Sequence, residues 1–435
     1  MKTIAIRICL AIMLFFMVSI FIRFGTKYIL IGKLYLDNWF TRAVFFDRTD
    51  VFFVSSSNRT RDIDWEKLYP PSFPVDNDVL FSKNIIKLPE KIKNKILSIE
   101  ANVEEYTNDY LIGRMQLVEY AVKYEITMDW NLHESVIDLG DGWLAEPIEE
   151  VNINPFAASI SEFNDYLKGL KIDFLYVQCP YNICKYDNIV SDFSNKNADN
   201  LLRMLARSRV PSLDLREHIH KENLNYHDLF YRTEPHWKIE TGLWAAKILG
   251  RYLRMYNAFD LDDKIFDFDQ YRLDVYENWF LGAMGRKITL ARTQPEDFTL
   301  IYPAFQTKLS LSIPTRNIDK QGTFDIFYNY NRIKTKDYYH VSPYGAFCYE
   351  RNPLVIINNE LIINGKKILC LVDSFGRIAV PFLALGIESV EMIDFRMFDG
   401  SIKTFIEQSN PDMVIVLYNP NILTKESFDI LFNFN

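Results

Sequence analysis

A serine, a histidine and a glutamate in this sequence have the types and contexts that acyl transfer needs. Ser374 follows the apolar run 368–372 and Asp373, so it would emerge where a buried strand ends. A serine hydroxyl becomes nucleophilic when an imidazole takes its proton, and that imidazole works best when a carboxylate orients it. Among the six histidines, His236 has a carboxylate, Glu234, two residues before it. We therefore hypothesise a Ser374–His236–Glu234 triad.

Each of these residues also has a purely structural explanation. Asp and Ser are favoured helix N-caps, so Asp373 and Ser374 could simply begin the next helix. Glu234 and Pro235 suit the turn that opens a helix, which would leave His236 an ordinary residue near a helix start. Neither segment alone decides between the two explanations.

The elements that would position these side chains alternate between strand and helix from about residue 135 onward. Short apolar strands joined by helical crossovers are typical of a parallel sheet with helices on both faces. Residues 265–350 differ, because they are rich in Tyr, Phe, Thr and Asn; we expect a β-rich insertion or lid there, or else irregular loops. The predicted helices are 159–170, 198–207 and 239–253, and the predicted strands are 173–177, 210–215, 367–372, 390–393 and 413–417.

Several short segments, taken in order, resemble the alginate O-acetyltransferase-like proteins of bacteria, an SGNH-hydrolase-related group that includes the DHHW family with its Asp-His-His-Trp motif. Residues 231–237 resemble that motif, and 373–376 resemble the nucleophile block. The resemblance extends over about 135–435. The other matching segments are 137–144 with its glycines and tryptophan, 174–180 ending in proline, 214–216, the Asp-x-Arg step 394–396, and 410–416.

The chain departs from the family motif just before the histidine. It has Glu234 where the family has aspartate, and Pro235 where the family has its first histidine. A glutamate can orient an imidazole, but its additional methylene requires a slightly displaced backbone. Three alternatives stay open: Glu234 completes the triad, Asp228 supports His236 instead, or the activity has been lost.

The resemblance implies an SGNH-hydrolase-like three-layer α/β/α sandwich with a parallel sheet, in a permuted order that places the histidine before the serine. It also implies an acyl-enzyme mechanism, which requires an oxyanion hole. The backbone N–H of Ser374 is the expected first donor. The further oxyanion or substrate candidates are Gly282, Arg396, Asn419 and Asp373.

Composition excludes other classes of protein. Apolar residues make up 49% of the 435 residues, which is enough for a sizeable core. A net charge of −8 without a long basic run provides no electrostatic footprint for nucleic acid. The five cysteines include no Cys-x-x-Cys pair and none lies beside a histidine at ligand spacing. We therefore predict no metal and no cofactor.

The N-terminal sequence predicts attachment to a membrane. Residues 1–25 hold an apolar run after Lys2 and Arg7, and no small-x-small cleavage site follows it, which indicates a single uncleaved signal anchor. Residues 26–133 are expected to form a linker and a helical region, and 134–435 the catalytic domain. The resemblance implies that the anchor lies in the bacterial cytoplasmic membrane with the catalytic domain outside the cytoplasm.

Three functions are compatible with these features. The first, implied by the resemblance, is a membrane-anchored O-acetyltransferase that acts on hydroxyls of a cell-surface or exported polysaccharide. With one span at most, the chain would receive acetyl groups from a separate multispanning membrane acyltransferase. The second is a carbohydrate acetyl-esterase with the same triad, and the third is a non-catalytic glycan-binding protein.

Overall fold

The computed structural model describes residues 136–434 except 187–188, 190–191 and 258. These residues belong to one compact unit, His133–Asn435. Within the described ranges, no helix is both long enough and apolar enough to cross a membrane. The predicted anchor and the predicted linker region lie outside the described residues and stay predictions.

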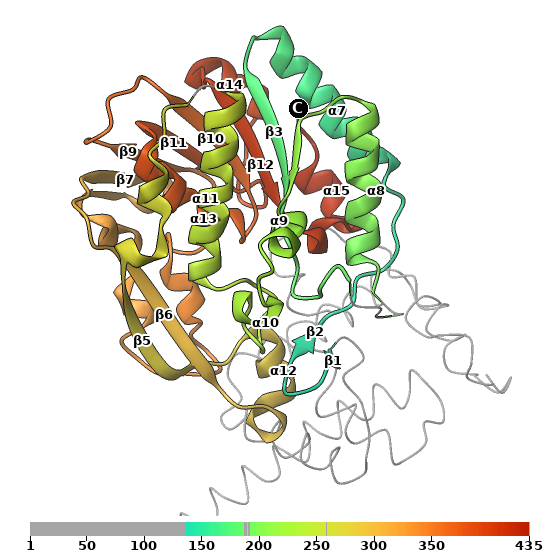
Figure 1. The fold of residues 1–435 in the computed structure, drawn as a ribbon, viewed down its shortest axis with the longest axis vertical. Helices are drawn as coiled ribbons and strands as arrows, with labels where there is room; N and C mark the ends of the chain where they lie inside the picture. Colours follow the sequence, from blue (N-terminus) through green and yellow to red (C-terminus); the bar gives the residue numbers. More distant parts are fainter. Residues whose placement is uncertain (1–135, 187–188, 190–191, 258, 435) are drawn as a thin grey trace, which may run out of the picture. The chain divides into compact units, whose positions relative to one another are not determined.

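An eight-stranded, mostly parallel sheet forms the centre of this unit, in the order β4-β3-β12-β10-β11-β9-β7-β8 (Figure 1). Its first five strands run parallel to one another. The predicted strand 367–372 matches β10, and the other predicted strands agree with the observed ones to within two residues at either end. The parallel strands are β4 (Ser212–Asp214), β3 (Asp173–Gln178), β12 (Met413–Tyr418), β10 (Lys367–Val372) and β11 (Ser389–Ile393).

The sequence predicted a parallel sheet, but the observed sheet is parallel only in part. Part of the insertion joins it in the antiparallel sense. β9 (Val355–Asn359) runs antiparallel to β11, and β7 (Leu309–Ile313) and β8 (Ile318–Gly322) continue the sheet in the antiparallel sense. The insertion also forms a separate two-stranded antiparallel sheet of β5 (Tyr271–Phe280) and β6 (Glu296–Pro303), which a helix connects. Antiparallel neighbours need only short turns, so an insertion can extend a sheet edge without helical crossovers.

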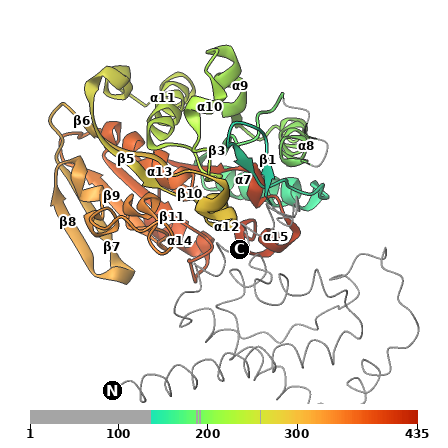
Figure 2. The same ribbon diagram turned by 90° about the horizontal axis from the view of Figure 1, so that it is seen from below.

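Helices cover both faces of the sheet, as the alternation of side chains along β10 shows. Ile368, Cys370 and Val372 belong to one buried cluster, whereas Leu369 and Leu371 belong to another. Successive side chains of a strand point to opposite faces, so the two clusters are the cores of two layers. Figure 2 shows helices on the two sides of the strands. The first cluster packs α11 (Ile239–Tyr256) and α13 (Gly376–Leu383); the second packs α7 (Asn154–Gly169), α8 (Ser194–Arg207), α14 (Ile402–Ser409) and α15 (Lys425–Leu431).

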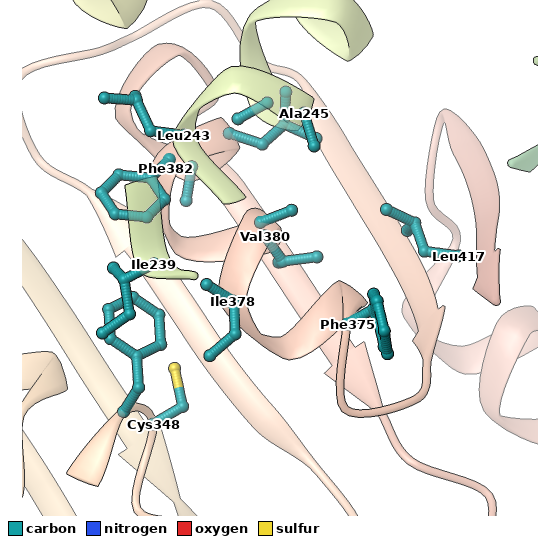
Figure 3. Close-up of a cluster of buried hydrophobic side chains, with 14 of the residues drawn as sticks. Ile239, Leu243, Ala245, Cys348, Phe375, Ile378, Val380, Phe382 and Leu417 are labelled. Atoms are coloured by element: carbon teal, nitrogen blue, oxygen red, sulfur yellow. The ribbon is translucent and has the colours of Figure 1, made fainter. Parts of the chain in front are cut away.

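The close contact of α11 with α13 determines where the functional segments meet. Figure 3 shows Ile239 and Leu243 of α11 beside Ile378 and Phe382 of α13. A Cβ at Gly242 would lie 2.5 Å from Ile378 Cγ2, so only glycine allows the two helices to approach this closely. Because α11 begins just after His236 and α13 just after Ser374, this packing brings both residues to one region.

The remaining helices and strands lie around the carboxyl ends of the parallel strands or in the insertion. The predicted helices 159–170 and 198–207 correspond to α7 and α8, which begin earlier in the chain, and 239–253 corresponds to α11. The other elements are β1 (Ile137–Asp138), β2 (Leu144–Ala145), α9 (Leu215–Lys221), α10 (Tyr226–Leu229) and α12 (Ala283–Arg292).

Candidate active site

The turn between β10 and α13 holds Ser374 at the carboxyl edge of the sheet. Asp373 Oδ1 accepts hydrogen bonds from the backbone N–H groups of Phe375 (2.7 Å) and Gly376 (3.4 Å). Its Oδ2 accepts from the backbone and the side-chain amide of Asn419, both at 2.7 Å. Burial raises the pKa of Asp373 despite these bonds. Asp373 therefore ties the turn to the end of β12 and leaves the Ser374 hydroxyl available for another partner.

His236 lies between the serine and a carboxylate. Its Nε2 is 2.6 Å from Ser374 Oγ, and its Nδ1 is 2.5 Å from Glu234 Oε1. The imidazole is 23% exposed, whereas the Glu234 side chain is 4% exposed. An imidazole held by a carboxylate at Nδ1 presents Nε2 to the serine in the tautomer that can accept its proton. The three side chains thus have the geometry of a nucleophile, a base and an orienting acid.

The N-terminus of α12 accommodates the longer side chain of Glu234. Its Oε2 accepts a hydrogen bond of 2.6 Å from the backbone N–H of Ala283, the first residue of that helix. A Cβ at Gly282 would lie 2.3 Å from Thr233 O and 2.5 Å from Glu234 Cβ, so glycine is required for this close approach. Burial alone would raise the pKa of Glu234, but His236, Arg286 and the Ala283 N–H lower it below its ordinary value. Glu234 is therefore held as a buried carboxylate.

A second buried glutamate, which the sequence did not reveal, holds the segment before Glu234. Glu296 on β6 accepts hydrogen bonds from the backbone N–H of Arg232 (2.8 Å) and from both the N–H (2.9 Å) and the hydroxyl (2.5 Å) of Thr233. Thr233 in turn accepts a bond of 2.9 Å from the Gly282 N–H. The only sequence signal for this role would be an acidic residue at the start of a largely apolar strand.

The other predicted site residues have different positions. Asp228 is exposed on α10, and it is Glu234 that contacts His236. Arg396 donates two hydrogen bonds to Asp394, from Nε at 2.8 Å and from Nη2 at 2.6 Å. The Asn419 amide bonds Asp373, and the Gly282 N–H bonds Thr233. Each of these three residues therefore has a partner within the protein, and their role at the oxyanion stays a prediction.

Aromatic side chains surround the imidazole. The ring of Tyr344 stacks on His236 with centroids 4.7 Å apart, and the ring of Phe375 lies 5.5 Å away. Phe375 also contacts the buried ring of Trp237, at 5.0 Å. Tyr344 lies in a short 3₁₀ helix, Pro343–Ala346, before β9, and nothing in the sequence pairs it with the motif residues. These rings limit the rotation of His236 about its side-chain bonds.

The described part of the chain contains no cluster of metal-ligating side chains. No three His, Cys, Asp or Glu side chains there lie together in a way that could hold an ion. Cys179, Cys348 and Cys370 are buried, and burial raises the pKa of the Cys348 thiol to about 12.

Comparison with known proteins shows a shared fold. No family model and no curated protein matches the sequence. PatB1 of Bacillus cereus matches over 69% of this chain and 99% of its own, with 18% identity and a TM-score of 0.57. A PatB1 structure with a sulfonyl adduct matches with 17% identity and a TM-score of 0.55, over 68% of this chain and 99% of PatB1. A DHHW family protein from Eubacterium siraeum matches with 18% identity and a TM-score of 0.52, over 68% of this chain and 93% of its own. The chain therefore has the fold of PatB1 and of a DHHW family protein, as the resemblance in sequence predicted.

Proposed function

We propose that this protein is an O-acetyltransferase of polysaccharides that works through an acyl-enzyme on Ser374. The observation that carries the proposal is the position of His236, 2.6 Å from Ser374 Oγ and 2.5 Å from Glu234 Oε1. The fold shared with a DHHW family protein supports it. His236 and Ser374 lie in the two segments, 231–237 and 373–376, that resemble the histidine motif and the nucleophile block of that family.

The reaction would proceed in two steps at the same serine. His236 Nε2 takes the proton of Ser374 as Oγ attacks the acetyl carbonyl, and the carbonyl oxygen becomes an oxyanion. The oxyanion collapses, the bond to the leaving oxygen breaks, and the leaving group takes the proton from His236. In the second step, an acceptor hydroxyl gives its proton to His236, attacks the acetyl-serine and releases Ser374, which recovers its proton. Glu234 stabilises the imidazolium that forms in each step.

The acceptor in this proposal is a hydroxyl of a cell-surface or exported polysaccharide, and the acetyl donor is supplied by a multispanning membrane acyltransferase. The predicted anchor over residues 1–25 would keep the catalytic domain at the outer face of the bacterial cytoplasmic membrane. The hypothesis of a non-catalytic glycan-binding protein arose because Glu234 stands where the family has aspartate. The contact between Glu234 and His236 weakens that hypothesis. An acetyl-esterase differs from a transferase only in the final acceptor, so experiment must separate the two.

The test is acylation of the full-length chain in detergent by p-nitrophenyl acetate, followed by intact-mass measurement. Wild type should gain the mass of one acetyl group, located at Ser374, and Ser374→Ala and His236→Ala should not. A sulfonyl fluoride offers a second probe of the same hydroxyl, as a PatB1 structure carries a sulfonyl adduct. If the rate of acetate release is the same with and without a polysaccharide acceptor, the result favours the esterase. Absence of any serine adduct in wild type would contradict both enzymes.

A further inference from the structure

Arg377 is a buried guanidinium without an acidic partner. It lies in the first turn of α13 and is 7% exposed, and its Nε has no hydrogen-bond partner. Among the described residues, no carboxylate lies within ion-pair distance of it, whereas the equally buried Arg216 binds Asp214 and Asp199. Buried arginines are almost always paired, because an uncompensated charge in the interior is costly. An unpaired one needs an explanation.

The carboxylates near Arg377 are committed elsewhere. Asp394 acts on the pKa of Arg377 but is hydrogen-bonded through both oxygens to Arg396, at 2.8 and 2.6 Å. Asp373 uses both oxygens for the backbone of the nucleophile turn and for Asn419. Burial lowers the pKa of Arg377 from its ordinary value, although a guanidinium stays charged at neutral pH. Among the described residues, the Arg377 guanidinium therefore has no carboxylate of its own.

Arg377 follows the proposed nucleophile, Ser374, by three residues. The Arg377 N–H donates to Asp373 O at 3.2 Å, so the chain between Ser374 and Arg377 follows a helical turn. Residues three apart on a helix are neighbours on one face. The guanidinium carbon also lies 5.5 Å from the ring centroid of Tyr344, which stacks on His236. Ser374, His236, Tyr344 and Arg377 thus form a continuous set of neighbours.

A strained loop presents Tyr344 to the other members of this set. Cys348, Tyr349 and Glu350, which follow it closely, all have left-handed backbones, with φ of 49°, 56° and 67°. Each such residue costs about 1–2 kcal/mol, so three in succession persist only when their surroundings hold them. Asn352 does so, since its side-chain amide donates to the carbonyls of Cys348 (2.8 Å) and Glu350 (3.1 Å). Backbone strain of this kind clusters at functional sites.

We propose that Arg377 stabilises the negative charge that develops on the acetyl carbonyl oxygen when Ser374 attacks. Its charge complements the oxyanion together with the Ser374 backbone N–H, and the Tyr344 ring holds the guanidinium in position. No bond to Arg377 forms or breaks: the serine proton goes to His236, the carbonyl electron pair goes to oxygen, and both return on collapse. The cost of the unpaired cation in the resting enzyme is recovered in the transition state, which is the form of binding that accelerates a reaction. This inference rests on the proposed acyl-enzyme.

The test compares Arg377→Met, Arg377→Lys and Arg254→Met in the full-length protein. Arg377→Met keeps the volume of the side chain and removes the charge; it should lower kcat for p-nitrophenyl acetate by about 10²–10³-fold and leave KM within about twofold. Because p-nitrophenyl acetate carries no charge, a loss of kcat cannot come from Arg377 binding an anionic group of the substrate. Arg377→Lys should recover part of kcat. Arg254→Met removes the charge of a half-exposed arginine in the last turn of α11, at the end of that helix away from His236, so it is the matched control and should leave kcat unchanged.

A second measurement does not depend on turnover. Phenylboronic acid forms a tetrahedral, negatively charged adduct with a serine oxygen, and its affinity should fall about tenfold or more in Arg377→Met. In wild type labelled with ¹⁵N-arginine, the Nε–H signal of Arg377, assigned with Arg377→Lys, should shift when boronate binds. This measurement remains available should Arg377→Met fail to fold.

Wild-type kcat and boronate affinity in folded Arg377→Met, or an unmoved Nε–H signal at saturating boronate, would overturn the inference. A loss of kcat in Arg254→Met as large as that in Arg377→Met would also overturn it, because the effect would then not depend on where the charge lies. If wild type itself neither acylates nor binds boronate at Ser374, it is the proposed function that fails.

Discussion

Replacing Glu234 by aspartate, the residue of the family motif, should impair this protein. The glutamate reaches two partners at once, His236 Nδ1 at 2.5 Å and the Ala283 N–H at 2.6 Å. Removing one methylene withdraws the carboxylate by about 1.5 Å, the length of a carbon–carbon bond, and leaves both distances near 4 Å. The backbone cannot follow, because Gly282 already packs against Thr233 O and Glu234 Cβ.

The size of the effect follows from these distances. Misplacing a catalytic group by about 1 Å costs on the order of 10² in rate, so Glu234→Asp should lower the acylation rate about 10²-fold, or about 2.7 kcal/mol in activation free energy. Losing the bond from the Ala283 N–H should also destabilise the fold by about 1–3 kcal/mol. Glu234→Gln keeps the length but loses the charge, and it should lower the rate further, toward 10⁴-fold.

Single-turnover acylation by p-nitrophenyl acetate, measured by rapid quench and intact mass, gives the rate directly. Thermal unfolding of the same variants separates loss of chemistry from loss of fold. A Glu234→Asp rate equal to or above that of wild type would refute the view that the local backbone is built for glutamate. A Glu234→Gln rate near wild type would refute the orienting role itself.

Other expected outcomes concern the supports of the site. Gly282→Ala should destabilise the fold by about 1–3 kcal/mol and lower the acylation rate, because the new Cβ would meet Thr233 O at 2.3 Å; Gly169→Ala, where a Cβ meets nothing within 4 Å, is the matched control in thermal unfolding and should be near neutral. Glu296→Ala should cost roughly 2–4 kcal/mol in urea unfolding, because it strips acceptors from the Arg232 and Thr233 N–H groups, and an unchanged midpoint would contradict this role. The folded pKa of Glu234 lies below its unfolded value, so its charge stabilises the fold above about pH 4.3 and less as pH falls through the folded pKa. The difference in unfolding free energy between wild type and Glu234→Gln should therefore shrink between about pH 7 and pH 3, and a constant difference would argue against a depressed pKa.

Local sequence was sufficient to predict the parallel core. β12, and β10 after Lys367, are apolar runs because both faces of a parallel strand are buried, and that burial leaves a signal within six residues. The same run predicted where Ser374 would emerge. The antiparallel strands β7 and β8 left a weaker signal, since their place at the sheet edge depends on pairing with β9 and not on their own composition.

The sequence by itself named Ser374 and His236 and the carboxylates Glu234 and Asp228, because these residues sit in motifs a few residues long. Only the tertiary structure showed that Glu234 contacts His236, that Arg396 binds Asp394, and that Asn419 binds Asp373. It alone also brought Glu296 and Tyr344 to the site. The bond between Ser374 and His236 joins residues 138 positions apart, and the bonds of Glu296 to Thr233 span 63. Helix and strand packing sets such contacts, and no local pattern of residue types encodes them.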